Sequence, residues 1–174
     1  LRNVDFNKTS KHNGLSGVTM MVRKGEILGI AGVDGNGQSQ LSQIVTGVAM
    51  AEAGEVVLKG CAVSRVTAAD FIEKNVSHIP EARNRMGLVG NMTVEENLLL
   101  KSTQDCAFCD LNGWHLKKKA MRAYSETMRA KYDIRCQGMD QEIRSLSGGN
   151  QQKVILAREL EAKPDLLVAV HPTR

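Results

Sequence analysis

Two glycine-rich stretches of this sequence carry polar residues at spacings that suit the binding of phosphate groups. The first reads GVDGNGQS at 32–39 and follows an apolar run, and the second reads LSGGNQQK at 146–153. A phosphate-binding loop follows the pattern G-x-x-x-x-G-K-[ST], in which small residues let backbone N–H groups turn toward an anion. The first stretch keeps Gly32, Gly37 and Ser39 of that pattern, but Gln38 stands at the lysine position.

The missing lysine predicts a weaker site, not an empty one. Backbone amides and the N-terminus of the following helix form an anion-binding nest without any lysine. An ammonium group near the terminal phosphate would add about 4 kcal/mol at ~4 Å and an effective dielectric of ~20, before desolvation. Glutamine donates a hydrogen bond but carries no charge, so we expect loose binding and poor stabilisation of the transition state. The expected cradle residues are Gly32, Asp34, Gly35, Asn36, Gly37, Gln38, Ser39 and Gln40.

Simpler interpretations of both stretches stay open on these residues alone. The first can be an ordinary glycine turn, although a dinucleotide-binding loop is excluded because Gln40 stands at its third glycine position. The second can be a plain helix N-cap. Alternatively, Ser147, Gly148 and Gly149 present a hydroxyl and backbone amides to an anion at that helix start.

Strands separated by helices predict a layered α/β fold around these stretches. An extended run is expected at 26–31, and its continuous apolar residues Ile27–Ala31 predict a strand buried on both faces. Thr93 and Glu96 form a capping-box pattern at a helix start. The other expected strands are an edge strand at 1–6, then 18–23, 54–60, 76–79 and a buried strand at 165–170; the other expected helices are 39–48, 67–74, 114–131 and 150–162.

Composition narrows the class of protein. The 174 residues fit one domain, and 23 basic against 19 acidic residues give an excess too small to argue for nucleic acid. Basic residues at 117–131 are interpreted as a solvated helix face. No apolar run reaches the ~20 residues of a membrane span. The first residues, LRNVDFNKTS, do not have the pattern of a secretory signal peptide. Because the sequence does not begin with Met, we expect it to be a piece of a longer chain.

The four cysteines are interpreted as free thiols of a cytosolic protein. Cys106 and Cys109, with His115 nearby, form a C-x-x-C pair that leaves a metal or redox site as the alternative. A second such pair, which a zinc site of this type needs, is not present in the sequence.

The chain resembles the ATP-binding domain of ABC transporters. Residues 32–39 resemble its phosphate loop, residues 146–153 its signature, and residues 166–173 its second nucleotide strand. More narrowly, the chain resembles the second, C-terminal ATP-binding domain of importers for simple sugars and nucleosides. The strings that carry this resemblance are GIAGVDGNGQSQL, HIPEARNRMGLV and LSGGNQQK. The resemblance implies an α/β P-loop NTPase (RecA-like) core with a small antiparallel β edge and a helical subdomain. It places the core at about 1–81 and 151–174 and the helical subdomain at about 82–150, with the C-terminal part of the domain absent.

Several family positions are altered here. The position of the magnesium-organising aspartate is Val170, which cannot hold a magnesium-bound water, and that of the general-base glutamate is His171. His171 is interpreted as a tolerated residue, with a role as base the alternative. The glutamine-loop position is Glu81, which either contacts metal or a membrane partner or is a surface carboxylate. Ser39 either binds Mg²⁺ weakly or only begins a helix. The aromatic that stacks on adenine is sought within about 6–14, where the candidates are Phe6 and His12.

The resemblance implies a division of labour between two domains packed head to tail. Ser147, Gly148 and Gly149 would act on ATP held by a partner domain, while this chain's own loop binds ATP and Mg²⁺ weakly or not at all. The implied partners are a second ATP-binding domain on the same polypeptide, transmembrane permease subunits and, indirectly, a substrate-binding protein, at the cytoplasmic face of the membrane. The alternatives are a non-hydrolytic regulatory nucleotide-binding module, and an ATPase of DNA repair or translation, which lacks the PEAR…GLV and SGGNQQK combination.

Overall fold

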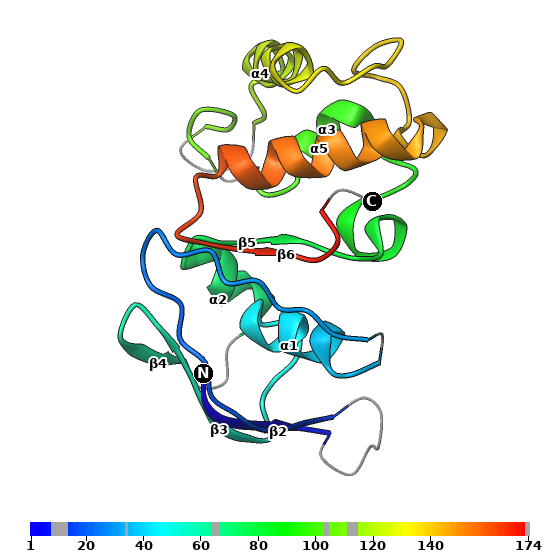
Figure 1. Cartoon of the computed structure of the whole chain (residues 1–174). Coiled ribbons are helices and arrows are strands. Elements are labelled where there is room, and N and C mark those ends of the chain that lie inside the picture. The colour runs from blue at the N-terminus through cyan, green and yellow to red at the C-terminus, as the bar shows by residue number, and fades with distance from the viewer. Residues whose placement is uncertain (8–13, 34, 64–66, 103–104, 111–114, 173–174) are drawn as a thin grey trace. The chain divides into compact units, whose positions relative to one another are not determined.

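The computed structural model describes residues 1–7, 14–33, 35–63, 67–102, 105–110 and 115–172 (Figure 1). Their contacts form two compact units, one of residues 1–78 and 165–170 and the other of residues 79–164 and 171–174. The subdomain boundaries expected from the sequence, near 81 and 150, stay a prediction.

The first unit holds an antiparallel sheet of four strands, as the expected β edge requires. The strands are β1 (Arg2–Phe6), β2 (Leu15–Val18), β3 (Ala53–Leu58) and β4 (Cys61–Val63), in the order β2-β1-β3-β4. The prediction that residues 1–6 form an edge strand was wrong, because β2 and β3 pair with β1 on its two sides. Alternating hydrophobicity reports a buried face and says nothing about the number of neighbouring strands.

Two helices complete the first unit's core. They are α1 (Gln38–Val45) and α2 (Ala68–Glu73), which bury Ile44 and Phe71. Phe71 lies against Gly47, where an added Cβ would stand 2.2 Å from the ring. The core thus fixes the C-terminal end of α1, and with it the helix that follows the glycine-rich loop. The buried members of this core are Val4, Leu15, Ile44, Val56, Phe71 and Val76.

The expected strands at 18–23 and 26–31 were wrong beyond Val18. Residues 19–33 belong to neither sheet of the described chain. Ile27 is 97% exposed and Ile30 is 54% exposed, although both were expected to be buried. A strand exists only where a neighbouring backbone pairs with it, and an apolar run predicts the tendency without supplying the neighbour.

A second sheet pairs β5 (Val76–Ile79) with β6 (Leu166–Ala169). The strand expected at 165–170 is present, but the expectation that it is buried was wrong. Its residues alternate between half-buried and exposed, and Leu167 is 38% exposed. With β5 as its described partner, β6 packs the half-buried Leu166 against the first unit's core.

The second unit is mostly helical and packs α3 (Val94–Leu99) against α4 (Lys118–Lys131) and α5 (Gly148–Glu161). Short turns at Arg83–Gly87 and Ile143–Ser145 precede α3 and α5. The predicted capping box is confirmed, because Glu96 N–H donates to Thr93 Oγ1 at 3.1 Å and Thr93 N–H donates to the Glu96 carboxylate at 2.8 Å. The buried apolar core of this unit comprises Ile79, Leu88, Val94, Leu98, Met128, Ile134, Met139, Ile143, Leu146, Val154, Ile155 and Ala157.

A buried ion-pair network ties α5 to the segment around α3. The Glu159 carboxylate is fully buried and accepts hydrogen bonds from Lys101 Nζ at 2.5 Å and Arg158 Nε at 2.9 Å. The same guanidinium donates to the backbone oxygens of Asn97 at 3.2 Å and Gly87 at 2.8 Å. Burial by itself raises the pKa of the Glu159 carboxyl, but the charges of Lys101 and Arg158 outweigh burial and hold that pKa below its ordinary value.

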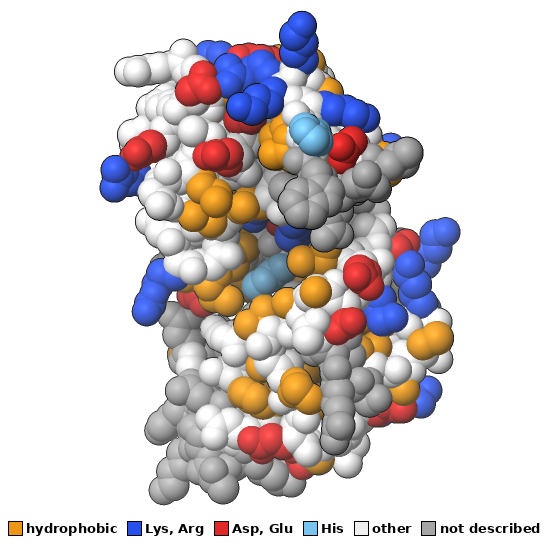
Figure 2. All heavy atoms as spheres, turned by 180° about the vertical axis from the view of Figure 1, so that it is seen from behind, with side chains coloured by type: hydrophobic (Ala, Val, Ile, Leu, Met, Phe, Trp, Pro, Cys, Tyr) orange, Lys and Arg blue, Asp and Glu red, His pale blue; other side chains and the backbone are white. Residues whose placement is uncertain are grey.

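Several charged side chains on the surface form ion pairs. Basic side chains of α4 contact acidic ones, with Arg122 on Asp140 and Glu95 and with Lys131 on Glu161. Figure 2 shows acidic and basic side chains interspersed on the visible face. No helix among the described residues is long and apolar enough to cross a membrane. The four cysteines are free thiols.

Replacement of the buried carboxylate should be costly. Glu159→Gln should lower the free energy of unfolding by about 3 kcal/mol, because Arg158 and Lys101 would keep their charges without the counter-charge. Urea denaturation measures the loss. The matched control is Glu142→Gln, which breaks an exposed pair with Arg144 and should cost less than about 1 kcal/mol. Equal losses for the two variants would contradict the assignment.

The same pair predicts a dependence on pH. The folded pKa of Glu159 lies below its unfolded value of 4.5, so its contribution to stability is complete above that value and is lost as pH falls through the folded pKa. The difference in unfolding free energy between the protein and Glu159→Gln should therefore shrink between about pH 5 and about pH 3. A constant difference over this range would show that ionisation of Glu159 does not contribute to the stability of the fold.

Candidate functional site

The glycine-rich loop of the first unit is shaped by two glycines in the left-handed region. Gly35 has φ 88° and Gly37 has φ 91°, and α1 begins directly after Gly37. An added Cβ at Gly37 would stand 2.8 Å from Leu15 Cδ2 and 3.1 Å from Gly14 O. Glycine alone fits both the positive φ and this close approach at the residue directly before α1. Asp34 lies outside the described residues.

Gln38 folds back over this loop. Its Nε2 donates a hydrogen bond to Val33 O at 3.2 Å and covers Gly32, where it stands 2.1 Å from the position of an added Cβ. The side chain at the lysine position thus binds a carbonyl oxygen of the loop itself. Ser39 is exposed in the first turn of α1, next to Gln40. The loop and helix start suit an anion, while the position nearest to the expected charge is occupied by a neutral amide.

The second glycine-rich stretch begins α5. Ser147 is the N-cap, and Gly148 and Gly149 form the first helical residues, with no acidic residue in that turn. Ser147 and Gly149 are exposed, and the Ser147 side chain makes no capping hydrogen bond to the first-turn amides. The structure therefore brings together an exposed hydroxyl and the positive end of a 14-residue helix, which is an arrangement that stabilises negative charge.

Residues to which the sequence had assigned no role hold this helix start. Asn150 Nδ2 donates to Ser147 Oγ at 2.9 Å, and Gln151 Nε2 donates to the Ile143 and Leu146 oxygens, both at 3.2 Å. The guanidinium of Arg83 lies against Gly148. Asn150 and Gln151 belong to the LSGGNQQK string and Arg83 belongs to the HIPEARNRMGLV string, so the available signal was the place of each residue in its motif.

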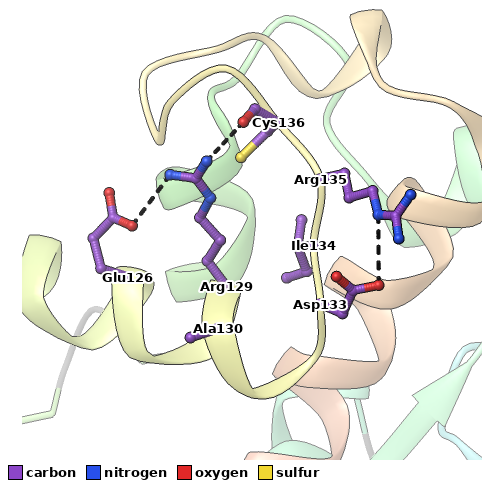
Figure 3. Close-up of a pocket in the computed structure, with 7 residues that line it drawn as sticks. All are labelled: Glu126, Arg129, Ala130, Asp133, Ile134, Arg135 and Cys136. Carbon is purple, nitrogen blue, oxygen red and sulfur yellow. Dashed lines mark hydrogen bonds and ion pairs between the residues drawn. The ribbon is translucent and has the colours of Figure 1, made fainter.

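A surface groove of about 490 Å³ lies beside this helix start in the second unit (Figure 3). Its charged groups bind one another, since Arg129 Nη1 donates to the Glu126 carboxylate at 3.4 Å and Arg135 lies 3.7 Å from the Asp133 carboxylate. A hydrogen bond from Lys153 lowers the pKa of Asp133, and burial raises the pKa of the Cys136 thiol. The thiol is therefore protonated near neutral pH. The groove is lined by Glu126, Arg129, Ala130, Asp133, Ile134, Arg135 and Cys136.

The remaining candidates lie at the ends of β5 and β6. Glu81 is exposed after β5, and His171 is exposed after β6 with φ 49°. The side chain of Val170, directly before His171, carries no oxygen. No cluster of three metal-binding side chains exists among the described residues. Phe6 packs against the first unit's core, and His12 lies outside the described part of the chain.

Comparisons with known proteins agree with these features. The family model described as ABC transporter matches residues 15–174. The chain is 40% identical over 157 residues to the guanosine import ATP-binding protein NupO of Bacillus subtilis, covering 90% of this chain and 30% of that protein. It is also 40% identical over 177 residues to the glucose import ATP-binding protein TsgD13 of Haloferax volcanii, covering 99% and 32%. The chain thus spans about a third of the length of these relatives.

The fold agrees with that of solved structures. A dimeric ATP-binding cassette in a post-hydrolysis state, bound to ADP and Pi, superposes with a TM-score of 0.75 at 21% identity, covering 99% of this chain and 73% of the other. This likeness confirms the expected α/β P-loop NTPase architecture.

The two signature glycines should respond differently to alanine. Gly149→Ala should raise the free energy of unfolding by about 0.5–1 kcal/mol, because alanine restricts the unfolded chain and no atom lies within 4 Å of its Cβ. Gly148→Ala should raise the free energy of unfolding by less, because its Cβ would stand 2.6 Å from Arg83 Nη2 and the Arg83 side chain must move. Urea denaturation of both variants compares the gains. Equal gains would place Arg83 away from the signature.

Proposed function

Since this chain belongs to the ABC transporter family, we propose that it is the ATP-binding component of an importer for simple sugars or nucleosides. The relatives named for guanosine and glucose import support this class of substrate. The observation that carries the proposal is the start of α5, where the exposed Ser147 hydroxyl and the first-turn amides form a site for a phosphate group.

In the proposed mechanism, Ser147, Gly148 and Gly149 complete an ATP site whose phosphate loop belongs to a second ATP-binding domain. The Ser147 hydroxyl and the glycine N–H groups donate hydrogen bonds to the γ-phosphate and stabilise the charge that develops there. Bound ATP supplies the phosphoryl group. These residues contribute charge stabilisation and position, and the residues that hold the nucleophile belong to the partner domain.

This chain's own loop is proposed to bind nucleotide weakly and not to hydrolyse it. Gln38 binds Val33 O and brings no charge, and Val170 cannot help to hold Mg²⁺. Ser39 keeps a hydroxyl that can contact Mg²⁺ when a nucleotide brings it. His171 occupies the general-base position but has no carboxylate beside it at residue 170. The pair of domains would therefore contain one competent site.

The proposed partners follow from this division of labour. A second ATP-binding domain, on the same polypeptide, would provide the competent loop, and transmembrane permease subunits would convert closure of the pair into alternating access. A substrate-binding protein would deliver the substrate to them. Glu81, exposed after β5, is the candidate contact to the permease at the cytoplasmic face of the membrane.

The signature can be tested in the assembled transport complex. Ser147→Ala should abolish ATP-driven uptake into vesicles and lower kcat for ATP hydrolysis by about 10²-fold, because one donor to the phosphate charge is lost. Ser145→Ala is the matched control, since that exposed hydroxyl donates to Glu142 O at 2.6 Å and should be dispensable. Unchanged uptake in Ser147→Ala would reject the proposal and favour a regulatory nucleotide-binding module.

The chain's own loop calls for a separate test. The purified chain should release no phosphate from Mg-ATP above background, and Gln38→Lys should leave turnover of the assembled complex nearly unchanged, because Val170 and His171 still lack the magnesium and base carboxylates. Phosphate-release assays measure both. Robust turnover by the isolated chain would contradict the assignment of a single competent site.

A further inference from the structure

The side chain of Asn150 is fixed at both ends. Its Oδ1 accepts a hydrogen bond from Arg135 N–H at 2.9 Å, and its Nδ2 donates to Ser147 Oγ at 2.9 Å. A backbone N–H can only donate, so the oxygen of the amide must face Arg135 and the nitrogen must face Ser147. The direction of the hydrogen bond to the serine follows from chemistry, independently of how the amide is drawn.

This bond changes what Ser147 does at the helix start. A serine at an N-cap normally accepts a hydrogen bond from a first-turn amide, and the third helical residue reaches back to the N-cap backbone. Here Asn150 is that third residue, and it reaches back to the serine side chain instead. The serine oxygen accepts from Asn150 and makes no capping hydrogen bond, so the first-turn amides are not bound by Ser147 and the hydroxyl proton points away from Asn150.

We propose that Asn150 is a positioning residue that makes Ser147 a hydrogen-bond donor toward the phosphate group and keeps the amides of Gly148 and Gly149 available to it. This inference rests on the proposed function of the α5 start. Asn150 acts through its hydrogen bond to Ser147 Oγ. Its anchor is the backbone of Arg135, so the 133–136 segment that lines the groove in Figure 3 also supports the signature.

The anchoring segment is itself held to α5. Lys153 Nζ donates to the backbone oxygen of Asp133 at 2.6 Å and to its carboxylate at 2.7 Å. Lys153 lies one turn after Asn150, so two side chains on one face of α5 hold the same loop. The position of Arg135 N–H, and through it the orientation of the Asn150 amide, is therefore set by two contacts to the helix.

Replacing the Asn150 amide by a carboxylate removes its hydrogen bond to Ser147 Oγ and keeps its hydrogen bond from Arg135 N–H. In Asn150→Asp the side chain can still accept from Arg135 N–H, but it can no longer donate to Ser147 Oγ. The carboxylate instead accepts the serine hydroxyl proton, which turns that proton away from the phosphate. An acidic residue in the first turn of a helix is favourable for stability, so the fold should be kept.

The experiment is a double-mutant cycle in the assembled transport complex, with kcat and KM for ATP hydrolysis and a thermal melt as readouts. We expect Asn150→Asp and Ser147→Ala each to lower kcat by about 10²-fold, with unchanged melting temperature, and the double variant to be no slower than Ser147→Ala alone. Asn150→Ala, which removes both hydrogen bonds, enters the same cycle with the same expectation for kcat but a lower melting temperature, and serves if the carboxylate variant fails to assemble.

Each outcome decides between the two proposals. The positioning role would be overturned if the two substitutions lowered kcat independently, so that adding Asn150→Asp to Ser147→Ala lowered kcat by the same factor as Asn150→Asp alone. That result would show that the carboxylate merely repels the nucleotide. Full activity of Asn150→Asp beside a slow Ser147→Ala would also overturn it. If Ser147→Ala itself turns over normally, the proposed function of the signature fails instead.

Discussion

The fully buried carboxylate of Glu159 is the interaction on which the arrangement of α5 depends. A charge without solvent contact persists only with close counter-charges, and Arg158 and Lys101 provide them. The Arg158 guanidinium also binds two backbone oxygens of the segment around α3. These contacts fix the C-terminal half of α5. Since a helix is stiff over 14 residues, they also help to fix the direction of its N-terminal end, where the signature lies.

The two helix starts of this chain illustrate different uses of the same physics. Both α1 and α5 follow glycine-rich segments, and both present first-turn amides where a phosphate can bind. At α1 the adjacent polar side chain, Gln38, folds back onto a loop carbonyl. At α5 the adjacent polar side chain, Asn150, is held by the backbone of another segment and donates a hydrogen bond to Ser147 Oγ. The first arrangement satisfies the loop internally, and in our proposal the second directs the serine proton outward.

The same difference underlies our proposal that only one of the two sites needs to be competent. A phosphate loop that hydrolyses ATP needs a charge, a magnesium ligand and a base, and the first unit lacks the lysine while residues 170 and 171 are valine and histidine. A signature needs a hydroxyl, small residues and amides in fixed geometry, all of which the start of α5 supplies. A domain that serves a partner's nucleotide requires only the second set.

The sequence by itself determined the family and the local structural signals around the two glycine-rich stretches. Motif spacing, the Thr93 capping box and the helix after Gln38 depend on neighbours within a few residues, so they can be read from the chain alone. The tertiary structure decided the exposure of Ile27, the internal position of β1 and the partial exposure of β6, because strand pairing joins distant segments. It also decided the orientation of the Asn150 amide. That orientation depends on Arg135 N–H, which lies 15 residues away in the chain and beside it in space.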